Sequence, residues 1–285
     1  MFLCQAVVAI GAMLPVIANA ESVTGHIDLV SKYYLRGITN TYGNGDPLGN
    51  KFADAPESNR PAVQWGADYA PATGFYAGYW GSTINYSYKQ LGDSYRDRTI
   101  SDFQRDKSIE NDFYGGYVAQ FGELKLNAGL TYYYYLNGTA ANAPETKLSI
   151  SQGPFTFMAQ TLLRDVVWGN SGDTYWTAAY TQALPYDFTF TSTLGFYTYQ
   201  REGRYVGSRD TATGTACQAG EAFIVNGCFA GGGLKSSAFR HLILGLSQPI
   251  GSTGLTWGAQ LIVGGQNRFG VNQGTRLAGS LSYGF

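Results

Sequence analysis

Charged residues are scarce in this sequence. They make up 14% of the 285 residues, against about 25% in typical soluble domains. The 19 Lys and Arg residues nearly balance the 20 Asp and Glu residues, which leaves a net charge of −1. Because there is no basic excess to neutralise phosphates, the composition gives no indication of nucleic-acid binding.

Long apolar runs are also missing once the first twenty residues are set aside. A transmembrane helix needs about 18 to 20 consecutive apolar residues, and no run after residue 20 approaches that length. Mean hydropathy is −0.16, which argues against a helical membrane protein. Glycine and tyrosine are abundant instead, at 38 and 22 residues. A β-barrel that is apolar outside and polar inside combines these features.

The first twenty residues predict a secretory signal peptide. An apolar core spans residues 6–17, and Ala18, Asn19 and Ala20 form an A-x-A cleavage site. No Lys or Arg precedes the core, so we expect either that the true start lies further upstream or that an unusual n-region is tolerated. The alternative is an uncleaved anchor helix, which the short length and Pro15 disfavour.

Cysteine is rare as well, with three residues in the chain. Cys4 would leave with the signal peptide. Cys217 and Cys228 would then meet an oxidising compartment, where a disulfide between them is the economical interpretation. We expect this bridge to stiffen an exposed loop against proteases.

Twelve segments alternate apolar with small or polar residues, which predicts β-strands with two different faces. The last segment shows the pattern well, because Leu277, Leu281, Tyr283 and Phe285 all point one way. Leu281, Tyr283 and Phe285 also resemble the C-terminal signal that the barrel-assembly machinery reads. The predicted strands are 23–36, 61–70, 75–84, 109–120, 124–136, 146–152, 155–166, 174–184, 188–200, 237–248, 255–265 and 275–285.

The connections between these segments alternate strictly between short turns and longer loops. Outer-membrane barrels show this arrangement, with short periplasmic turns and long external loops. An open sheet edge in lipid would leave backbone groups unpaired, so the sheet must close. The sequence therefore predicts an all-β fold, a closed antiparallel barrel of about 12 strands over residues 21–285. Its location would be the cell outer membrane, in contact with lipid and lipopolysaccharide.

Alternation assigns six basic and four acidic side chains to the lumen. Rings of charge set the selectivity of a pore, so we expect passive diffusion of small polar solutes with a mild preference for anionic or zwitterionic ones. The alternative is a non-conducting structural or adhesive barrel, whose lumen is filled by paired charges. The charged positions assigned to the lumen are Asp28, Lys32, Arg36, Asp68, Glu110, Asp112, Lys125, Lys147, Arg164 and Arg276.

Three further expectations follow from the same pattern. Tyr133 and Tyr135 should face the lumen. Arg240 falls on the outer face near the rim, where its side chain could snorkel towards lipid phosphates. Segment 86–108 carries balanced charge and is either a solvated loop or a loop folded into the pore.

Signals for catalysis are sparse. The two histidines, His26 and His241, fall near opposite rims of a barrel about 25 Å tall, so they cannot share a metal. No nucleophile elbow, phosphate-binding loop, dinucleotide fingerprint or metal-spaced cluster occurs. We therefore expect neither an enzyme nor a cofactor. A secreted soluble β-rich binding protein and an outer-membrane lipid hydrolase are less favoured alternatives.

Three blocks of sequence, Val30–Thr39, Pro61–Tyr69 and Gly74–Ser82, together resemble the TorF family of proposed outer-membrane porins, also known as the Gcw_chp proteins of unknown function. The resemblance implies an outer-membrane barrel and indicates little about the solute. Lys32 stands where the family usually has Asp, which weakens any inference about a shared lumenal charge pattern. Our hypothesis for this region is a structural pair between Arg36 and Asp68 beneath the first long loop.

Overall fold

The computed structural model describes residues 22–39, 57–84, 108–136, 138, 140–166, 168–208, 216, 235–268 and 270–285. The predicted signal peptide, Cys217 and Cys228 lie outside the described residues, as does segment 86–108 apart from residue 108. Among the described residues, no helix is long and apolar enough to cross a membrane.

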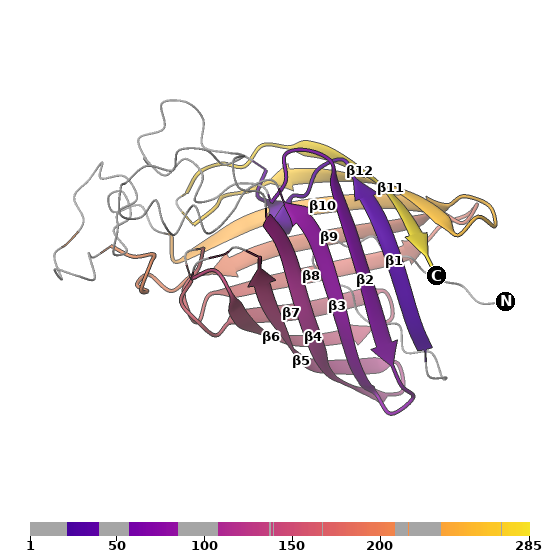
Figure 1. Cartoon of the computed structure of the whole chain (residues 1–285), viewed down its shortest axis with the longest axis horizontal. Coiled ribbons are helices and arrows are strands. Elements are labelled where there is room, and N and C mark those ends of the chain that lie inside the picture. Colours follow the sequence, from indigo (N-terminus) through magenta and orange to yellow (C-terminus); the bar gives the residue numbers. More distant parts are fainter. Residues whose placement is uncertain are drawn as a thin grey trace.

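Within this part of the chain, twelve strands form a closed antiparallel barrel, which confirms the predicted fold (Figure 1). Neighbouring strands in the chain are neighbours in the sheet, and β1 pairs with β12 to complete the ring. The strands are β1 Ser22–Val30, β2 Ala62–Ala70, β3 Phe75–Ile84, β4 Ser108–Phe121, β5 Leu124–Tyr135, β6 Ala143–Gln152, β7 Phe155–Leu162, β8 Thr174–Ala183, β9 Thr189–Thr198, β10 Ser237–Pro249, β11 Leu255–Gly264 and β12 Arg276–Gly284.

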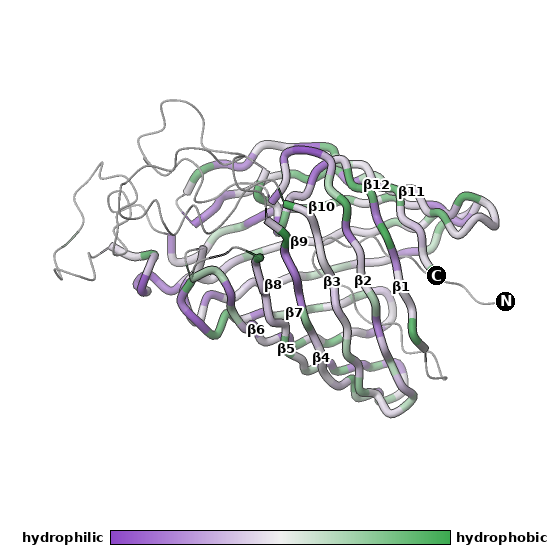
Figure 2. The backbone as a smooth tube through the Cα atoms, viewed as in Figure 1, coloured by the Kyte–Doolittle hydropathy of each residue, from purple (hydrophilic) through white to green (hydrophobic). Residues whose placement is uncertain are grey.

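The outer wall of the barrel is apolar. Along β1, Val23, Ile27 and Leu29 are exposed, whereas Asp28 and Val30 between and beyond them are buried. Hydrophobic and hydrophilic stretches alternate along the strands in Figure 2. A wall that exposes large hydrophobic side chains and encloses polar ones suits surrounding lipid.

The short connections lie at one end of the barrel, together with the C-terminus (Figure 1). Gly122 and Gly153 adopt positive φ in two of these turns. Tyr186 and Asp187 in the β8–β9 turn also have positive φ. We call this end the short-turn end and the opposite end the long-loop end. The predicted alternation of turn lengths is therefore confirmed.

Tyrosine side chains lie along the inner wall over glycines that leave room for them. The Tyr76 hydroxyl donates to Asn127 Oδ1 (2.9 Å), and the Tyr76 side chain passes over Gly116 and Gly129 on β4 and β5. A Cβ atom at Gly116 would lie 2.5 Å from a backbone oxygen and 2.6 Å from the Tyr76 hydroxyl. Because backbone cannot move aside cheaply, glycine is required at this position.

We therefore expect Gly116→Ala to lower the free energy of unfolding by about 1–3 kcal/mol through overpacking. Urea-induced unfolding of the barrel in lipid vesicles measures this change. Gly279→Ala is the matched control, because its Cβ would meet nothing closer than 3.8 Å. Equal stability of the two variants would contradict the packing described here.

Candidate functional site

After Ser31, whose backbone N–H still donates to the carbonyl of Gly279 on β12 (2.8 Å), the chain leaves the barrel wall and folds into the lumen. We call residues 31–39 the lumenal segment. β1 ends at Val30, so the predicted strand over 23–36 is six residues too long. Tyr33, Tyr34 and Arg36 are all buried, a pattern that no alternating strand would show. The short 3-10 helix η1 (Leu35–Gly37) forms the middle of the segment.

The segment is held at both of its ends. Tyr33 and Ser58 exchange two backbone hydrogen bonds of 2.9 and 3.1 Å, and Lys32 Nζ donates to the carbonyl of Asn59 (2.6 Å). At the other end, the Thr39 hydroxyl donates to a carbonyl in the β11–β12 loop (2.6 Å). Residues on both sides of Arg36 are therefore fixed to the long-loop end.

Arg36 reaches across the lumen to Glu145 on β6, which lies almost opposite β1 in the ring. Its guanidinium donates to both carboxylate oxygens, at 3.0 and 2.6 Å, and to the hydroxyls of Tyr133 (2.9 Å) and Tyr197 (2.5 Å). Burial lowers the pKa of Arg36, but the Glu145 carboxylate together with Tyr133 and Tyr197 outweighs this effect and holds that pKa well above its usual range. The Arg36 guanidinium is therefore charged inside the barrel.

Three tyrosine rings complete the surroundings of the guanidinium. The Arg36 Cζ atom lies 4.7 Å from the ring centroid of Tyr175 and 5.9 Å from those of Tyr133 and Tyr197, within the range of a cation–π interaction. We call Tyr133, Glu145, Tyr175 and Tyr197 the cage. Its members come from β5, β6, β8 and β9, so the wall alone builds it.

The hypothesis that Arg36 pairs with Asp68 is wrong. Asp68 accepts a hydrogen bond from the Tyr114 hydroxyl (2.6 Å) instead. Alternation placed Arg36 on a strand next to β2, whereas the chain has already left the wall when it reaches Arg36. The inward turn carries the side chain away from β2 and towards the far wall.

The backbone at the centre of the segment is unusual. Arg36 has φ 49° and ψ 36°, and Gly37 has φ 74°, so two consecutive residues are left-handed. A Cβ at Gly37 would lie 2.7 Å from the His241 side chain. His241 in turn lies 2.6 Å from the Tyr175 hydroxyl through its Nε2 atom. Gly37 of the segment therefore packs against His241, and His241 also orients the ring of Tyr175 in the cage.

The prediction that Arg240 faces lipid is wrong as well. Arg240 is buried, and its Nε atom donates to the carbonyl of Arg36 (3.0 Å). The cause is a β-bulge, because the β9–β10 register shifts between Phe239 and His241. A bulge sets two residues against one on the partner strand, so Arg240 and His241 are both buried and strict alternation fails.

Other residues predicted for the lumen occupy varied environments. Asp28 Oδ2 lies 2.8 Å from His26 Nδ1. Glu110 is fully buried and accepts a hydrogen bond from Tyr135 (3.0 Å), which with buried Tyr133 confirms the inward direction of both tyrosines. One carboxylate oxygen of Asp112 is enclosed without a hydrogen-bond partner among the described residues.

The remaining basic positions are not gathered at one site. Lys147 is buried on β6, two residues from Glu145. Lys125 and Arg276 are exposed near the ends of β5 and β12. Arg164 follows the end of β7 and is exposed, so strand alternation does not place it in the lumen.

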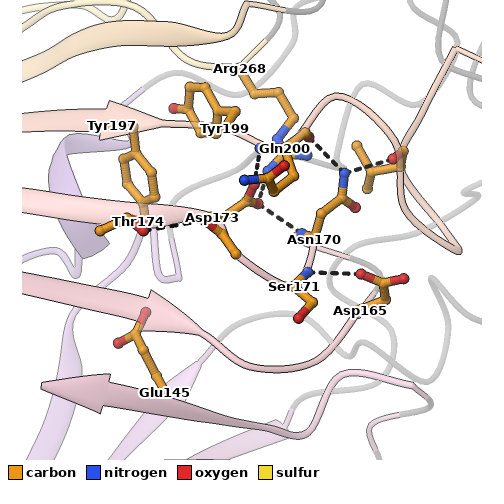
Figure 3. Close-up of polar contacts among 12 residues, drawn as sticks. Glu145, Asp165, Asn170, Ser171, Asp173, Thr174, Tyr197, Tyr199, Gln200 and Arg268 are labelled. Carbon is orange, nitrogen blue, oxygen red and sulfur yellow. Dashed lines mark hydrogen bonds and ion pairs between the residues drawn. The ribbon is translucent and has the colours of Figure 1, made fainter.

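The long-loop end carries a second polar network, centred on Asp173 (Figure 3). Its carboxylate accepts hydrogen bonds from the backbone N–H groups of Asn170 (2.7 Å) and Gln200 (2.8 Å), and it pairs with Arg268. Arg268 Cζ also lies 4.8 Å from the ring centroid of Tyr199. The network ties together the connections that follow β7, β9 and β11.

This network is joined to the cage by stacked rings. Tyr199 and Tyr197 are parallel, with centroids 4.9 Å apart, and Tyr197 lies 5.1 Å from Tyr175. The fixed loops therefore help to set the positions of two cage tyrosines.

Glu145 is the main residue of the candidate site that the sequence pattern missed. The predicted strand began at residue 146, whereas β6 begins at Ala143. Extending the alternation from Lys147 by one step would have placed Glu145 in the lumen. For His241 and Arg240 no such signal existed, because a bulge leaves no mark in the hydrophobic pattern.

A closed barrel with an apolar outer wall and a polar lumen defines an outer-membrane β-barrel protein. The chain belongs to the family of bacterial proteins of unknown function named Gcw_chp, whose model matches residues 17–239. A search among curated proteins found no match. Within the described residues, no group of three or more His, Cys, Asp or Glu side chains could hold a metal ion.

Several solved structures follow a similar course. Outer membrane phospholipase A from Escherichia coli is 13% identical over 91% of this chain and 92% of that chain, with a TM-score of 0.42. The Salmonella typhi outer membrane phospholipase dimer with bound calcium is 11% identical over 91% and 90%, with a TM-score of 0.41. A variant of OccD1 (OprD) is 11% identical over 82% and 61%, with a TM-score of 0.37. The strand pairing itself defines the closed barrel.

We expect Arg36→Ala and Glu145→Gln each to lower the free energy of unfolding by about 3–5 kcal/mol, because each leaves a buried group without its partner. The double variant should cost clearly less than the sum. Urea unfolding in lipid vesicles measures the coupling. Arg36→Ala combined with Asp68→Asn is the control and should be additive within about 0.5 kcal/mol. Stronger coupling of Arg36 to Asp68 than to Glu145 would contradict the geometry.

Proposed function

We propose that this protein lets small polar solutes cross the outer membrane through a lumen that the lumenal segment closes in the present state. One observation carries the proposal. A polar lumen lies inside an apolar wall, and it is crossed by a segment that is not part of that wall. This role agrees with the resemblance to the TorF family of proposed porins.

The wall and the segment differ in how they are held. Continuous backbone pairing around the ring fixes the strands. The middle of the segment is held by side-chain contacts instead. Arg36 bonds Glu145 and two hydroxyls, Arg240 donates to the Arg36 carbonyl, and Tyr34 packs in a small apolar cluster. Its left-handed backbone at Arg36 also stores strain. A segment held in this way can shift while the barrel stays intact.

The solute preference is a separate question. A surplus of basic lumenal residues suggested anionic or zwitterionic solutes, but Arg36 is compensated by Glu145 and Arg164 lies beyond a strand end. A zwitterionic solute remains our proposal, because acidic and basic side chains both line the lumen near the cage.

A filled, non-conducting barrel is the second candidate. It is favoured by the burial of Arg36, Glu145 and Glu110, since an open path beside them would expose these charges. A lipid hydrolase is less favoured. His26 contacts Asp28, and His241 contacts Tyr175 inside the barrel, so neither histidine side chain faces lipid. We therefore also propose that the protein is not an enzyme.

Single-channel recording in planar bilayers tests the proposal. We expect wild-type barrels to be mostly closed with brief openings. Arg36→Gly with Glu145→Gln should give a several-fold larger mean conductance, because it releases the segment without leaving an unpaired charge. Asp68→Asn is the matched control and should behave as wild type, because Asp68 accepts its hydrogen bond from Tyr114 on the wall and not from the segment.

The absence of ion flux in the wild type and in the double variant would favour the filled barrel. If the double variant conducts, liposome swelling with anionic, zwitterionic and cationic solutes of graded size then measures the solute preference.

A further inference from the structure

The cage is complete without the lumenal segment. Its carboxylate, three aromatic rings and two hydroxyls all come from strands, and Glu145 is also oriented by hydrogen bonds from the wall. Tyr133 donates to Glu145 Oε2 (2.8 Å), and so does Gln160 Nε2 (3.1 Å). If the segment moved away, a preorganised acidic and aromatic site would remain on the wall.

The chemistry of this site selects a guanidinium group. Two N–H groups of Arg36 meet the two oxygens of Glu145, a planar fork-to-fork contact that an ammonium cannot make. A third and a fourth hydrogen bond go to tyrosine hydroxyls. The Tyr175 ring lies 4.7 Å from the cationic carbon, where its face attracts positive charge. Together, the carboxylate, the hydroxyls and the aromatic ring match the planar shape, the positive charge and the N–H donors of a guanidinium group.

The residue that now fills the cage is tethered and strained. Arg36 is a non-glycine residue with φ 49°, and such backbone persists only where surrounding contacts hold it. A tethered group competes at an effective concentration on the order of millimolar. Arg36 therefore behaves as a built-in occupant that keeps weaker cations out.

We propose that the cage is a binding site for solutes that bear a guanidinium group, and that Arg36 occupies it as an internal competitor in the closed state. This inference deepens the proposed function, because it names the solute class for the same lumen. Arg240 Nε now donates to the carbonyl of Arg36. A solute that replaces Arg36 would satisfy this donor with an acceptor oxygen of its own, as a zwitterion can.

Methylguanidinium is the probe, and methylurea is its uncharged control of similar shape. Arg36→Gly empties the cage and relieves the left-handed backbone, which glycine adopts without strain. We expect methylguanidinium at millimolar concentration to raise the folded fraction of Arg36→Gly several-fold near its unfolding midpoint, as measured by heat-modifiable mobility on gels. Methylurea should have no effect, and wild type should respond less than twofold because Arg36 fills the cage.

Two double variants locate the response. Arg36→Gly with Glu145→Gln should lose it, whereas Arg36→Gly with Asp68→Asn should keep it. If Arg36→Gly does not fold alone, the probe is added during refolding, and a restored yield supports the site. A yield that the probe does not change, a response to methylurea, or a response that survives Glu145→Gln would overturn the site.

Bilayer recording separates this inference from the proposed function. Stabilisation by methylguanidinium in a barrel that never conducts would keep the site and remove the transport role. Conductance without stabilisation would keep the transport role and remove the site.

Discussion

Backbone groups in hydrocarbon have no water to bond, so each strand must pair along both edges. This constraint closes the ring between β1 and β12 and thereby fixes the circumference of the lumen. The apolar side chains turn outwards to lipid, which leaves the polar ones to meet one another inside. A lumen of fixed size then has to be filled by side chains, by water or by chain that leaves the wall. In this protein the chain itself enters, immediately after the first strand.

The entering segment brings a charge with it, and an isolated buried charge is costly. Glu145 meets that charge from nearly the opposite wall, the hydroxyls of Tyr133 and Tyr197 accept hydrogen bonds from Arg36, and Tyr175 presents its ring face. Such a pair contributes little net stability relative to apolar packing, but it strongly penalises any arrangement that separates the partners. The contact therefore specifies where the segment lies more than how stable the barrel is. An ion pair of this kind suits the proposed closing segment, which has one well-defined position and can still leave it.

The sequence predicted the barrel well because lipid outside and polar groups inside impose period 2 on every strand. Nearly all strand bounds were foreseen to within three residues, and Tyr133, Tyr135 and Glu110 were assigned to the correct face.

The site was foreseen only in part. Arg36 was assigned to the lumen, but its partner was not, because alternation gives the face of a residue on a strand and says nothing about chain that leaves the wall. Arg240 was misplaced because one inserted residue at a bulge reverses the faces beyond it. Glu145 was missed because the predicted strand began at residue 146, whereas β6 begins at Ala143.

The pairing of Arg36 with Glu145 across the lumen is the claim on which the site depends, and exchanging the two charges tests it most directly. Arg36→Glu alone and Glu145→Arg alone each place like charges together in a buried cage, so each should give little folded barrel in refolding assays with lipid vesicles. The protein that carries both changes restores opposite charges at nearly the same total side-chain length, and it should recover most of the wild-type folded yield. If the exchanged protein folds no better than either single variant, or if Arg36→Glu is rescued by Asp68→Arg instead, the segment does not lie across the lumen as described.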